Sequence, residues 1–262
     1  MKVLDYFDLS GRVAVVTGGA GKYGYQIVEA LAEAGACVYV ASRDRENNLA
    51  RLAALINEGY PISVLDFDLE DEQSIIAMCD KVYSMEGHVD ILVNNAVLRC
   101  TSGYSVDTAE AFGRSMCANA TGLFVISRAF GDRMAAAGTG SIINIGSYMG
   151  ILGPDYRLYD GTDMCPNGSA GDYFFHKGGM TNYTRFLASH YGLRGVRANC
   201  VELGGLYNGQ DEKFVARYSE KTMLGRMACD SDLKGLIVYL ASDASAYMTG
   251  AIIPLDGGYS AK

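Results

Sequence analysis

Tryptophan is absent from this 262-residue chain, and proline (4 residues) and histidine (3 residues) are scarce. Few prolines together with an apolar content of 49% are typical of a compact folded chain and not of a disordered or fibrous one. No apolar run approaches the length that crosses a membrane, and residues 1–10 lack the basic start and apolar stretch of a signal peptide. We therefore expect a cytoplasmic protein with no membrane partner.

Basic segments are missing as well. The 22 Lys and Arg residues are outnumbered by 30 Asp and Glu residues, which gives a net charge of −8. Proteins that bind nucleic acid generally carry a basic patch that neutralises phosphates. We expect no nucleic-acid partner, which leaves a small-molecule substrate as the natural ligand.

Metal-binding patterns are also absent. The seven cysteines form no CxxC pair, and His88, His176 and His190 show no metal-ligand spacing with them. We expect no metal site. Several cysteines, including Cys37 and Cys200, lie within apolar runs, so buried free thiols are the simplest interpretation.

Short apolar runs alternate with longer stretches of helical periodicity along the whole chain. This alternation predicts one α/β domain over residues 1–262, a Rossmann-like, doubly wound sheet of seven parallel strands flanked by helices. Strands are expected at residues 12–16, 37–41, 63–67, 90–93, 141–145, 197–201 and 251–255. Helices are expected between Gly24 and Gly35 and at residues 48–57, 72–85, 109–137, 173–190 and 231–241.

Two long segments, residues 148–172 and 204–222, interrupt this alternation. Each follows the carboxyl end of a predicted strand, where open α/β sheets bind ligands. The second segment contains glycines that can serve as hinges and a short helix with the apolar side chains Phe214, Val215 and Tyr218 on one face. A substrate lid over residues 204–222 is one interpretation, and a permanently docked helix is the other.

The first predicted strand runs into the glycine-rich turn Thr17-Gly18-Gly19-Ala20-Gly21-Lys22-Tyr23-Gly24, and a helix follows. Such a turn presents backbone N–H groups and the positive end of the helix to a pyrophosphate. Glycines also serve tight turns for purely structural reasons, so the turn alone has little specificity.

Tyr173 and Lys177 are four residues apart on a predicted helix and therefore share a face. Taken alone, the pair favours a packed tyrosine beside a solvated lysine. Further motifs occur in order at successive sheet elements: Thr17-Gly18 with Gly24, Asn94-Asn95-Ala96, Asn119, Ser147, and then Tyr173 with Lys177. In this combination the chain, from Arg12 to Gly258, resembles the short-chain dehydrogenase/reductase family.

The resemblance implies an NAD(P)-dependent oxidoreductase that acts on CH–OH groups and assembles as a homo-oligomer, a tetramer in the family. It implies that Tyr173 is the catalytic acid/base and that Lys177 is the cation that favours its phenolate. Ser147 would bind the substrate oxygen, and Asn119 would hold a proton-relay water. The implied cofactor-binding residues are Thr17, Gly18, Gly19, Lys22, Tyr23, Gly24, Ser42, Arg43, Asp68, Leu69, Asn95, Ala96, Tyr173, Lys177, Gly204 and Asn208.

The chain departs from the family pattern at Lys22, where a glycine is usual, and at Val97, Leu203 and Asn208. Where NAD-preferring relatives carry an acidic residue, this chain has Ser42 followed by an arginine. An acidic residue would repel a 2′-phosphate and arginine binds one, so NADP(H) is favoured over NAD(H). The alternative is a solvated Arg43 paired with Asp44, and Arg45 suits either role.

The segment 148–172 carries many polar side chains, which suit a sugar, polyol or sugar-acid substrate, although a surface or oligomer-contact loop accounts for them equally well. A second hypothesis is the reduction of an apolar ketoacyl or steroid ketone. A third is a nucleotide-binding regulatory protein without turnover, suggested by Lys22, Val97 and Leu203. The polar residues that would bind a sugar-like substrate are Asp155, Tyr156, Arg157, Tyr159, Asp160, Thr162, Asp163 and Asn167. The residues that would line a pocket for an apolar ketone are Met149, Ile151, Leu152, Leu206 and Tyr207.

Overall fold

Seven strands form the central sheet of the computed structural model, which describes residues 2–261. They are β1 (Val13–Thr17), β2 (Cys37–Ser42), β3 (Ile62–Asp66), β4 (Ile91–Asn94), β5 (Gly140–Ile145), β6 (Val196–Leu203) and β7 (Ile252–Leu255). Every neighbouring pair is parallel, and the order across the sheet is β3-β2-β1-β4-β5-β6-β7. The predicted doubly wound parallel sheet is confirmed. The chain reverses its direction of winding between β1 and β4, which opens a crevice at their carboxyl ends.

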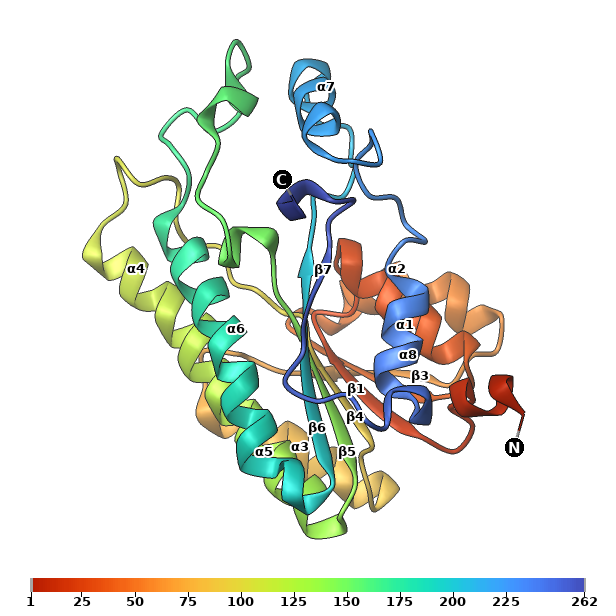
Figure 1. Cartoon of the computed structure of the whole chain (residues 1–262). Helices are drawn as coiled ribbons and strands as arrows, with labels where there is room; N and C mark the ends of the chain where they lie inside the picture. The colour runs from red at the N-terminus through yellow and green to blue at the C-terminus, as the bar shows by residue number, and fades with distance from the viewer. Residues whose placement is uncertain (1, 262) are drawn as a thin grey trace.

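Helices cover both faces of the sheet (Figure 1). One face carries α1 (Lys22–Glu33), α2 (Arg45–Asn57) and α8 (Lys234–Ala241), and the other carries α3 (Glu72–Glu86), α4 (Ala109–Met116), α5 (Leu123–Ala137) and α6 (Gly171–Tyr191). The remaining helix, α7 (Glu212–Lys221), lies beyond the carboxyl ends of the strands, opposite the segment that precedes α6. None of the helices within residues 2–261 has the length and apolar character to cross a membrane.

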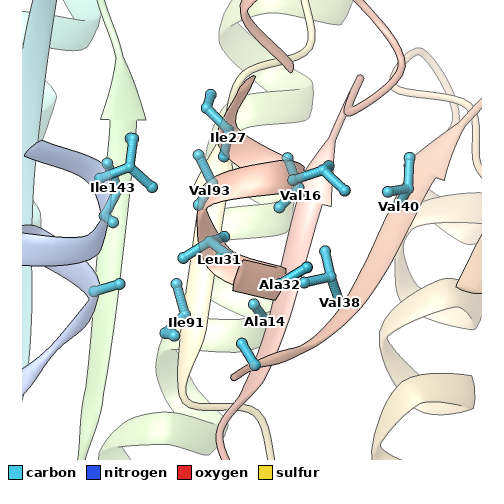
Figure 2. Packing of buried hydrophobic residues seen from close by; sticks show 14 of the residues in the cluster. Ala14, Val16, Ile27, Leu31, Ala32, Val38, Val40, Ile91, Val93 and Ile143 are labelled. Atoms are coloured by element: carbon cyan, nitrogen blue, oxygen red, sulfur yellow. The ribbon is translucent and has the colours of Figure 1, made fainter. Parts of the chain in front are cut away.

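The core lies in two layers, one on each side of the sheet. All five residues of β1 are buried, with Ala14 and Val16 in the layer beneath α1 and Val13 and Val15 in the opposite layer. Because both faces are covered, the strands are continuously apolar and not alternating. Figure 2 shows side chains of α1 packed on those of four strands: Ile27, Leu31 and Ala32 against Ala14, Val16, Val38, Val40, Ile91, Val93 and Ile143.

Several helix ends differ from the predicted ones, and at α2 a capping side chain decides the start. Helix α2 begins three residues earlier than predicted, because the Asp44 carboxylate accepts a hydrogen bond from the Asn47 amide at 3.2 Å. The last long helix begins at Lys234 instead of residue 231. The predicted helix at residues 109–137 is interrupted by a π-helical turn (Cys117–Gly122) between α4 and α5, which contains Asn119. Such wide turns are frequent at functional sites.

The cysteines only partly match the expectation of buried thiols. All seven are free, and Cys79 and Cys200 are buried. Cys117 and Cys229 are exposed, because they lie on the outer side of the π-helical turn and in the loop before α8. Of the two cysteines named in the expectation, Cys200 is buried and Cys37 is only partly buried.

Candidate active site

A cleft of about 730 Å³ opens at the carboxyl ends of the strands. It extends from the glycine-rich turn after β1 to the first turns of α6, and it receives side chains from α7. The predicted site residues that line it are Gly18, Lys22, Tyr23, Gly24, Ser42, Arg43, Asp68, Leu69, Asn95, Ala96, Ser147, Tyr173, Lys177 and Gly204. The topology therefore brings most of the predicted cofactor and catalytic residues into one continuous cleft.

Four predicted residues do not line this cleft. The Thr17 hydroxyl lies behind it and accepts hydrogen bonds from the amides of Asn95 at 3.0 Å and Ala96 at 2.9 Å, which joins the ends of β1 and β4. Gly19 serves packing, since a Cβ there would be 2.7 Å from Val28. Asn208 is exposed and its amide donates to the Gln210 side chain at 2.7 Å, so Gln210 lines the cleft in its place. Asn119, the fourth, is described below.

The turn after β1 requires glycine for two different reasons. Gly18 has φ +63°, a conformation that side chains disfavour, and a Cβ on Gly24 would lie 2.2 Å from the Gly18 carbonyl oxygen. The turn therefore closes tightly, and the first-turn amides of α1, which have no acceptor within the helix, adjoin the cleft beside Lys22. This set of donors fits the pyrophosphate of a nicotinamide dinucleotide.

Tyr23 connects the two walls of the cleft. Its hydroxyl donates to the Gly204 carbonyl oxygen at 2.9 Å, although the two residues lie on α1 and directly after β6. Burial raises the pKa of Tyr23 above its usual range, so the hydroxyl stays a donor at neutral pH.

The far end of the cleft, next to β2 and β3, contains charges of both signs. Arg43 lies 3.7 Å from the Glu70 carboxylate, which also forms a 2.8 Å ion pair with Arg114. The hydrogen bond from Arg114 lowers the pKa of Glu70, so this carboxylate is charged at neutral pH. Asp44 caps α2, and its carboxylate is not the partner of Arg43.

Two further residues at this end were not predicted. Arg51 and Glu70 line the cleft beside Ser42 and Arg43. Arg51 lies one helical turn after Asn48, which also lines the cleft, so the spacing on α2 was a signal that sequence reasoning could have used. Arg45 instead donates to the Val64 carbonyl oxygen at 3.2 Å, which leaves Arg43 and Arg51 as the cations facing the cleft here.

The catalytic candidates meet at the middle of the cleft, where β5 ends beside α6. Lys177 is buried, and its ammonium donates to the Ile145 carbonyl oxygen at 2.6 Å and lies 5.8 Å from the centre of the Tyr173 ring. The Ser147 hydroxyl oxygen accepts a hydrogen bond from the Met149 amide at 3.2 Å. That contact uses a lone pair, so the hydroxyl proton of Ser147 is free to donate to a substrate oxygen.

Asn119 lies behind Lys177 and is fully engaged with the chain after β4. Its side-chain nitrogen donates to the Leu98 carbonyl oxygen at 2.8 Å, and its side-chain oxygen accepts from the Leu98 amide at 2.9 Å. A small cavity of about 10 Å³ adjoins Asn119, His176 and Lys177. This is close to the smallest space that holds one water molecule, and both ring nitrogens of the buried His176 have no hydrogen-bond partner within residues 2–261.

Two more residues of the centre were missed by sequence reasoning. The Arg99 guanidinium lies over the Tyr173 ring, with its Cζ atom 4.6 Å from the ring centre. Glu202 is completely buried at the end of β6 and accepts a hydrogen bond from the Ser147 amide at 2.6 Å. The available signal for Glu202 was an acidic residue at the apolar carboxyl end of a strand, directly between Val201 and Leu203, where a charge is costly to bury without a purpose.

The segment before α6 packs against α7. The Asp155 carboxylate accepts from the Lys221 ammonium at 2.5 Å, Lys213 donates to the Gly161 carbonyl oxygen at 3.0 Å, and Arg217 donates to the Asp160 carbonyl oxygen. From this segment Tyr148, Met149 and Met164 line the cleft, and the polar residues expected to bind substrate hydroxyls do not. The segment is attached to α7 by the Asp155 carboxylate and by the main-chain carbonyl groups of Asp160 and Gly161.

Helix α7 places its apolar face on the cleft, as its spacing predicted. Phe214 and Tyr218 are buried and line the cleft, while Asp211, Glu212 and Lys213 are exposed. The Tyr218 hydroxyl accepts a hydrogen bond from the Gly205 amide at 2.6 Å, which fastens α7 to the end of β6. Within residues 2–261, no three His, Cys, Asp or Glu side chains are grouped in a way that would hold a metal ion.

A family model of short-chain dehydrogenases, described as enoyl-(acyl carrier protein) reductase, matches residues 22–260. The cis-4-hydroxycyclohexanecarboxylate dehydrogenase of Sinomonas cyclohexanicum is 32% identical over 95% of this chain and 97% of that protein. The galactitol 2-dehydrogenase (L-tagatose-forming) of Cereibacter sphaeroides is 31% identical over 98% and 99%.

Among solved structures, a gluconate 5-dehydrogenase from Burkholderia cenocepacia in complex with NADP and tartrate superposes with a TM-score of 0.88, at 27% identity over the whole of both chains. The matches extend over almost the full length of the chain, and the fold agrees with them. The chain therefore belongs to the short-chain dehydrogenase/reductase family and is a nicotinamide-dependent oxidoreductase of CH–OH groups.

Proposed function

We propose that this enzyme interconverts a polar secondary alcohol and its ketone with NADP(H), and that the substrate carries a carboxylate, as a sugar acid does. The observation that carries the proposal is Arg99, a cation beside the reacting group. Its guanidinium stacks on the ring of Tyr173 and lines the same cleft. Within residues 2–261, Arg99 forms no ion pair or hydrogen bond with the protein, so its donors are available to a ligand.

A guanidinium in this position suits a carboxylate better than a hydroxyl, because its parallel N–H groups bind both carboxylate oxygens. The contact would place the acid group next to Tyr173 and Ser147. Two of the related proteins support this class by their names: one acts on a hydroxycyclohexanecarboxylate and the other is a gluconate dehydrogenase bound to tartrate.

Tyr173, Ser147 and Lys177 would each have a separate part in proton transfer to and from the substrate oxygen. Hydride exchange is what a bound nicotinamide supplies. The Tyr173 hydroxyl gives a proton to the substrate oxygen in reduction and takes it in oxidation, and Ser147 donates a hydrogen bond to the same oxygen. The Lys177 ammonium, held by the Ile145 carbonyl oxygen at 2.6 Å, places a positive charge 5.8 Å from the centre of the Tyr173 ring.

The preference for NADP(H) follows from the charges beside β2. Ser42 leaves room for a 2′-phosphate, and Arg43 and Arg51 provide cations for it. The negative charge of Glu70 would repel a 2′-phosphate, and Glu70 forms an ion pair with Arg43. We therefore expect Glu70 to reduce the preference for NADP(H) over NAD(H). The gluconate 5-dehydrogenase relative binds NADP.

An alcohol on a less polar ring is the second candidate, favoured by the walls of the substrate end. Met149, Met164, Phe214 and Met227 line this part and offer no hydrogen bonds. A carboxylate on an apolar ring would use both these walls and Arg99. A neutral polyol, the substrate type named for the galactitol relative, would use neither.

Matched substrate pairs test the proposal. Oxidation of gluconate is compared with that of glucitol, and oxidation of cis-4-hydroxycyclohexanecarboxylate with that of 4-methylcyclohexanol, with NADP⁺ and with NAD⁺. We expect higher kcat/KM for the carboxylates, and Arg99→Gln should lower it about 10- to 100-fold for them, and less than threefold for the neutral compounds. Arg128→Gln is the control, since Arg128 also stacks on an aromatic ring but lies outside the cleft. Equal loss for acids and neutral alcohols would contradict the proposal.

We also propose that the enzyme is a homo-oligomer, a tetramer by family resemblance. Exposed aromatic side chains gather on α4, α5 and α6, where Phe112 and Phe175 contact each other edge to face. Large exposed apolar patches usually mark interfaces. Light scattering on the purified protein tests this, with Phe175→Glu expected to lower the molar mass.

A further inference from the structure

The carboxylate of Glu202 lies beneath the catalytic residues and has none of the roles described above. Glu202 is 0% exposed, and within residues 2–261 no basic nitrogen is within 4.0 Å of its carboxylate. It is held by neutral donors: the Ser147 amide at 2.6 Å, the Thr181 hydroxyl at 2.6 Å and the Cys200 thiol at 3.5 Å. A buried carboxylate with no cation is expensive, which argues against an incidental residue.

Gly146 shows that the backbone is adapted to this side chain. A Cβ at residue 146 would lie 2.5 Å from one Glu202 carboxylate oxygen and 2.7 Å from its carboxyl carbon. The φ angle of Gly146 is not in the left-handed region, so its backbone conformation does not require glycine. That Cβ would also lie 2.8 Å from the Cys200 sulfur, so space for Glu202 and for its donor Cys200 explains the glycine directly before Ser147.

The carboxylate joins the two elements that carry the reacting groups. One oxygen accepts from the Ser147 amide, at the end of β5, and the other accepts from Thr181, one turn after Lys177 on α6. The segment from Ile145 to Ser147 is thus held from two sides: Lys177 donates to the Ile145 carbonyl oxygen, and Glu202 accepts from the Ser147 amide.

We propose that Glu202 is a positioning residue that fixes the Ser147 main chain, and through it the direction of the Ser147 hydroxyl, relative to Tyr173 and Lys177. It acts through Ser147 and does not touch substrate or cofactor. The inference depends on the alcohol–ketone chemistry of the family and not on the substrate class proposed above.

Four variants test this role: Glu202→Ala, Glu202→Gln, Gly146→Ala and the double variant. Glu202→Ala should lower kcat about 100-fold, the scale expected when a reacting group is misplaced by about 1 Å, with the Kd of NADPH changed less than twofold. Glu202→Gln should keep most of kcat, because its amide oxygen accepts from Ser147 and its amide nitrogen donates to Thr181. Gly146→Ala should be as severe as Glu202→Ala, and combining the two should add little further loss.

Two measurements are made on each folded variant. Turnover is followed as NADPH oxidation with 2,3-butanedione, a small ketone without a carboxylate. Hydrogen exchange at the Ser147 amide is measured by NMR and needs no turnover; its protection should fall at least tenfold in Glu202→Ala and be retained in Glu202→Gln.

The outcomes separate this role from simple stabilisation of the fold. Loss of both kcat and Ser147 protection in Glu202→Ala, with rescue by glutamine, supports the proposal. It is overturned if kcat is unchanged, whatever happens to the melting temperature, or if kcat falls while Ser147 remains protected. If the wild-type enzyme does not reduce butanedione, the exchange data alone decide, and substrate choice is tested separately by the carboxylate pairs.

Discussion

The Lys177 ammonium lies 5.8 Å from the centre of the Tyr173 ring, and its proton is held by the main chain at the end of β5. This contact couples the cation to the segment that carries Ser147. Lys177→Ala should lower kcat at least 100-fold, because it removes both the cation beside Tyr173 and the hydrogen bond that holds the end of β5. Steady-state rates check this, with Lys81→Ala as an exposed control on α3. Near-normal kcat in Lys177→Ala would contradict the role.

Charges near β2 should control the choice of cofactor. Arg43→Ala should weaken NADP(H) more than NAD(H), by about ten- to hundredfold in Kd, since charge-assisted bonds to a phosphate contribute about 1.5–3 kcal/mol. Glu70→Gln should act in the opposite direction, because it removes the carboxylate 3.7 Å from Arg43. Fluorescence titration of both reduced nucleotides measures the two effects. Equal weakening of both cofactors by Arg43→Ala would show that this arginine does not bind the 2′-phosphate.

His176 should make the fold sensitive to acid. Burial, followed by the charge of Lys177, lowers the pKa of His176 to about 3 from an unfolded value of 6.5. Between these values the unfolded chain binds a proton that the folded chain does not, so the free energy of unfolding falls as the pH falls below about 6.5. The slope is at most about 1.4 kcal/mol per pH unit for this one group.

Urea unfolding at pH 7 and pH 5 tests the contribution of His176 to the pH dependence of the free energy of unfolding. His176→Gln should reduce the loss of stability between the two pH values, whereas His190→Gln, on the exposed side of the same helix, should leave the loss as in the wild type. Identical pH dependence in all three proteins would mean that His176 is not the acid-sensitive group.

Residues 204–222 should act as a lid whose closed position is held by the segment before α6. Amide exchange across α7 should be fast without ligands and slow when NADPH and substrate are bound together. Lys221→Ala removes the 2.5 Å contact with Asp155 and should increase exchange of α7 in the free enzyme. Strong protection of α7 without ligand, unchanged by saturation, would favour the permanently docked helix.

Local patterns were sufficient to predict the strands and to select three residues that meet in the cleft. Apolar runs identified all seven strands, and motif order identified Ser147, Tyr173 and Lys177. Contacts between residues far apart in the sequence could not be predicted, because spacing along one helix or strand does not indicate which other element packs against it. The ion pair of Glu70 with Arg114 and the attachment of Asp155 to Lys221 are of this kind.

The polar segment 148–172 illustrates the same limit. Its composition indicated groups for substrate hydroxyls, yet composition does not say which side of a segment faces the cleft. In the fold the Asp155 side chain and two main-chain carbonyl groups of the segment bond to α7, and Tyr148, Met149 and Met164 face the cleft. The π-helical turn at Asn119 was also hidden, because a turn that is one residue wider leaves the apolar pattern of a helix nearly unchanged.

Tyr173→Phe gives the most direct test of the whole account, because it removes one hydroxyl and almost no packing. Single-turnover reduction of NADP⁺ by the best alcohol of the carboxylate and neutral panel should slow about 100- to 10,000-fold, the range expected when a positioned proton-transfer group is lost. The Kd of NADPH should stay within about twofold of the wild-type value. Near-normal turnover in this variant, with the cofactor bound as in the wild type, would contradict the assignment of Tyr173 as the proton-transfer residue.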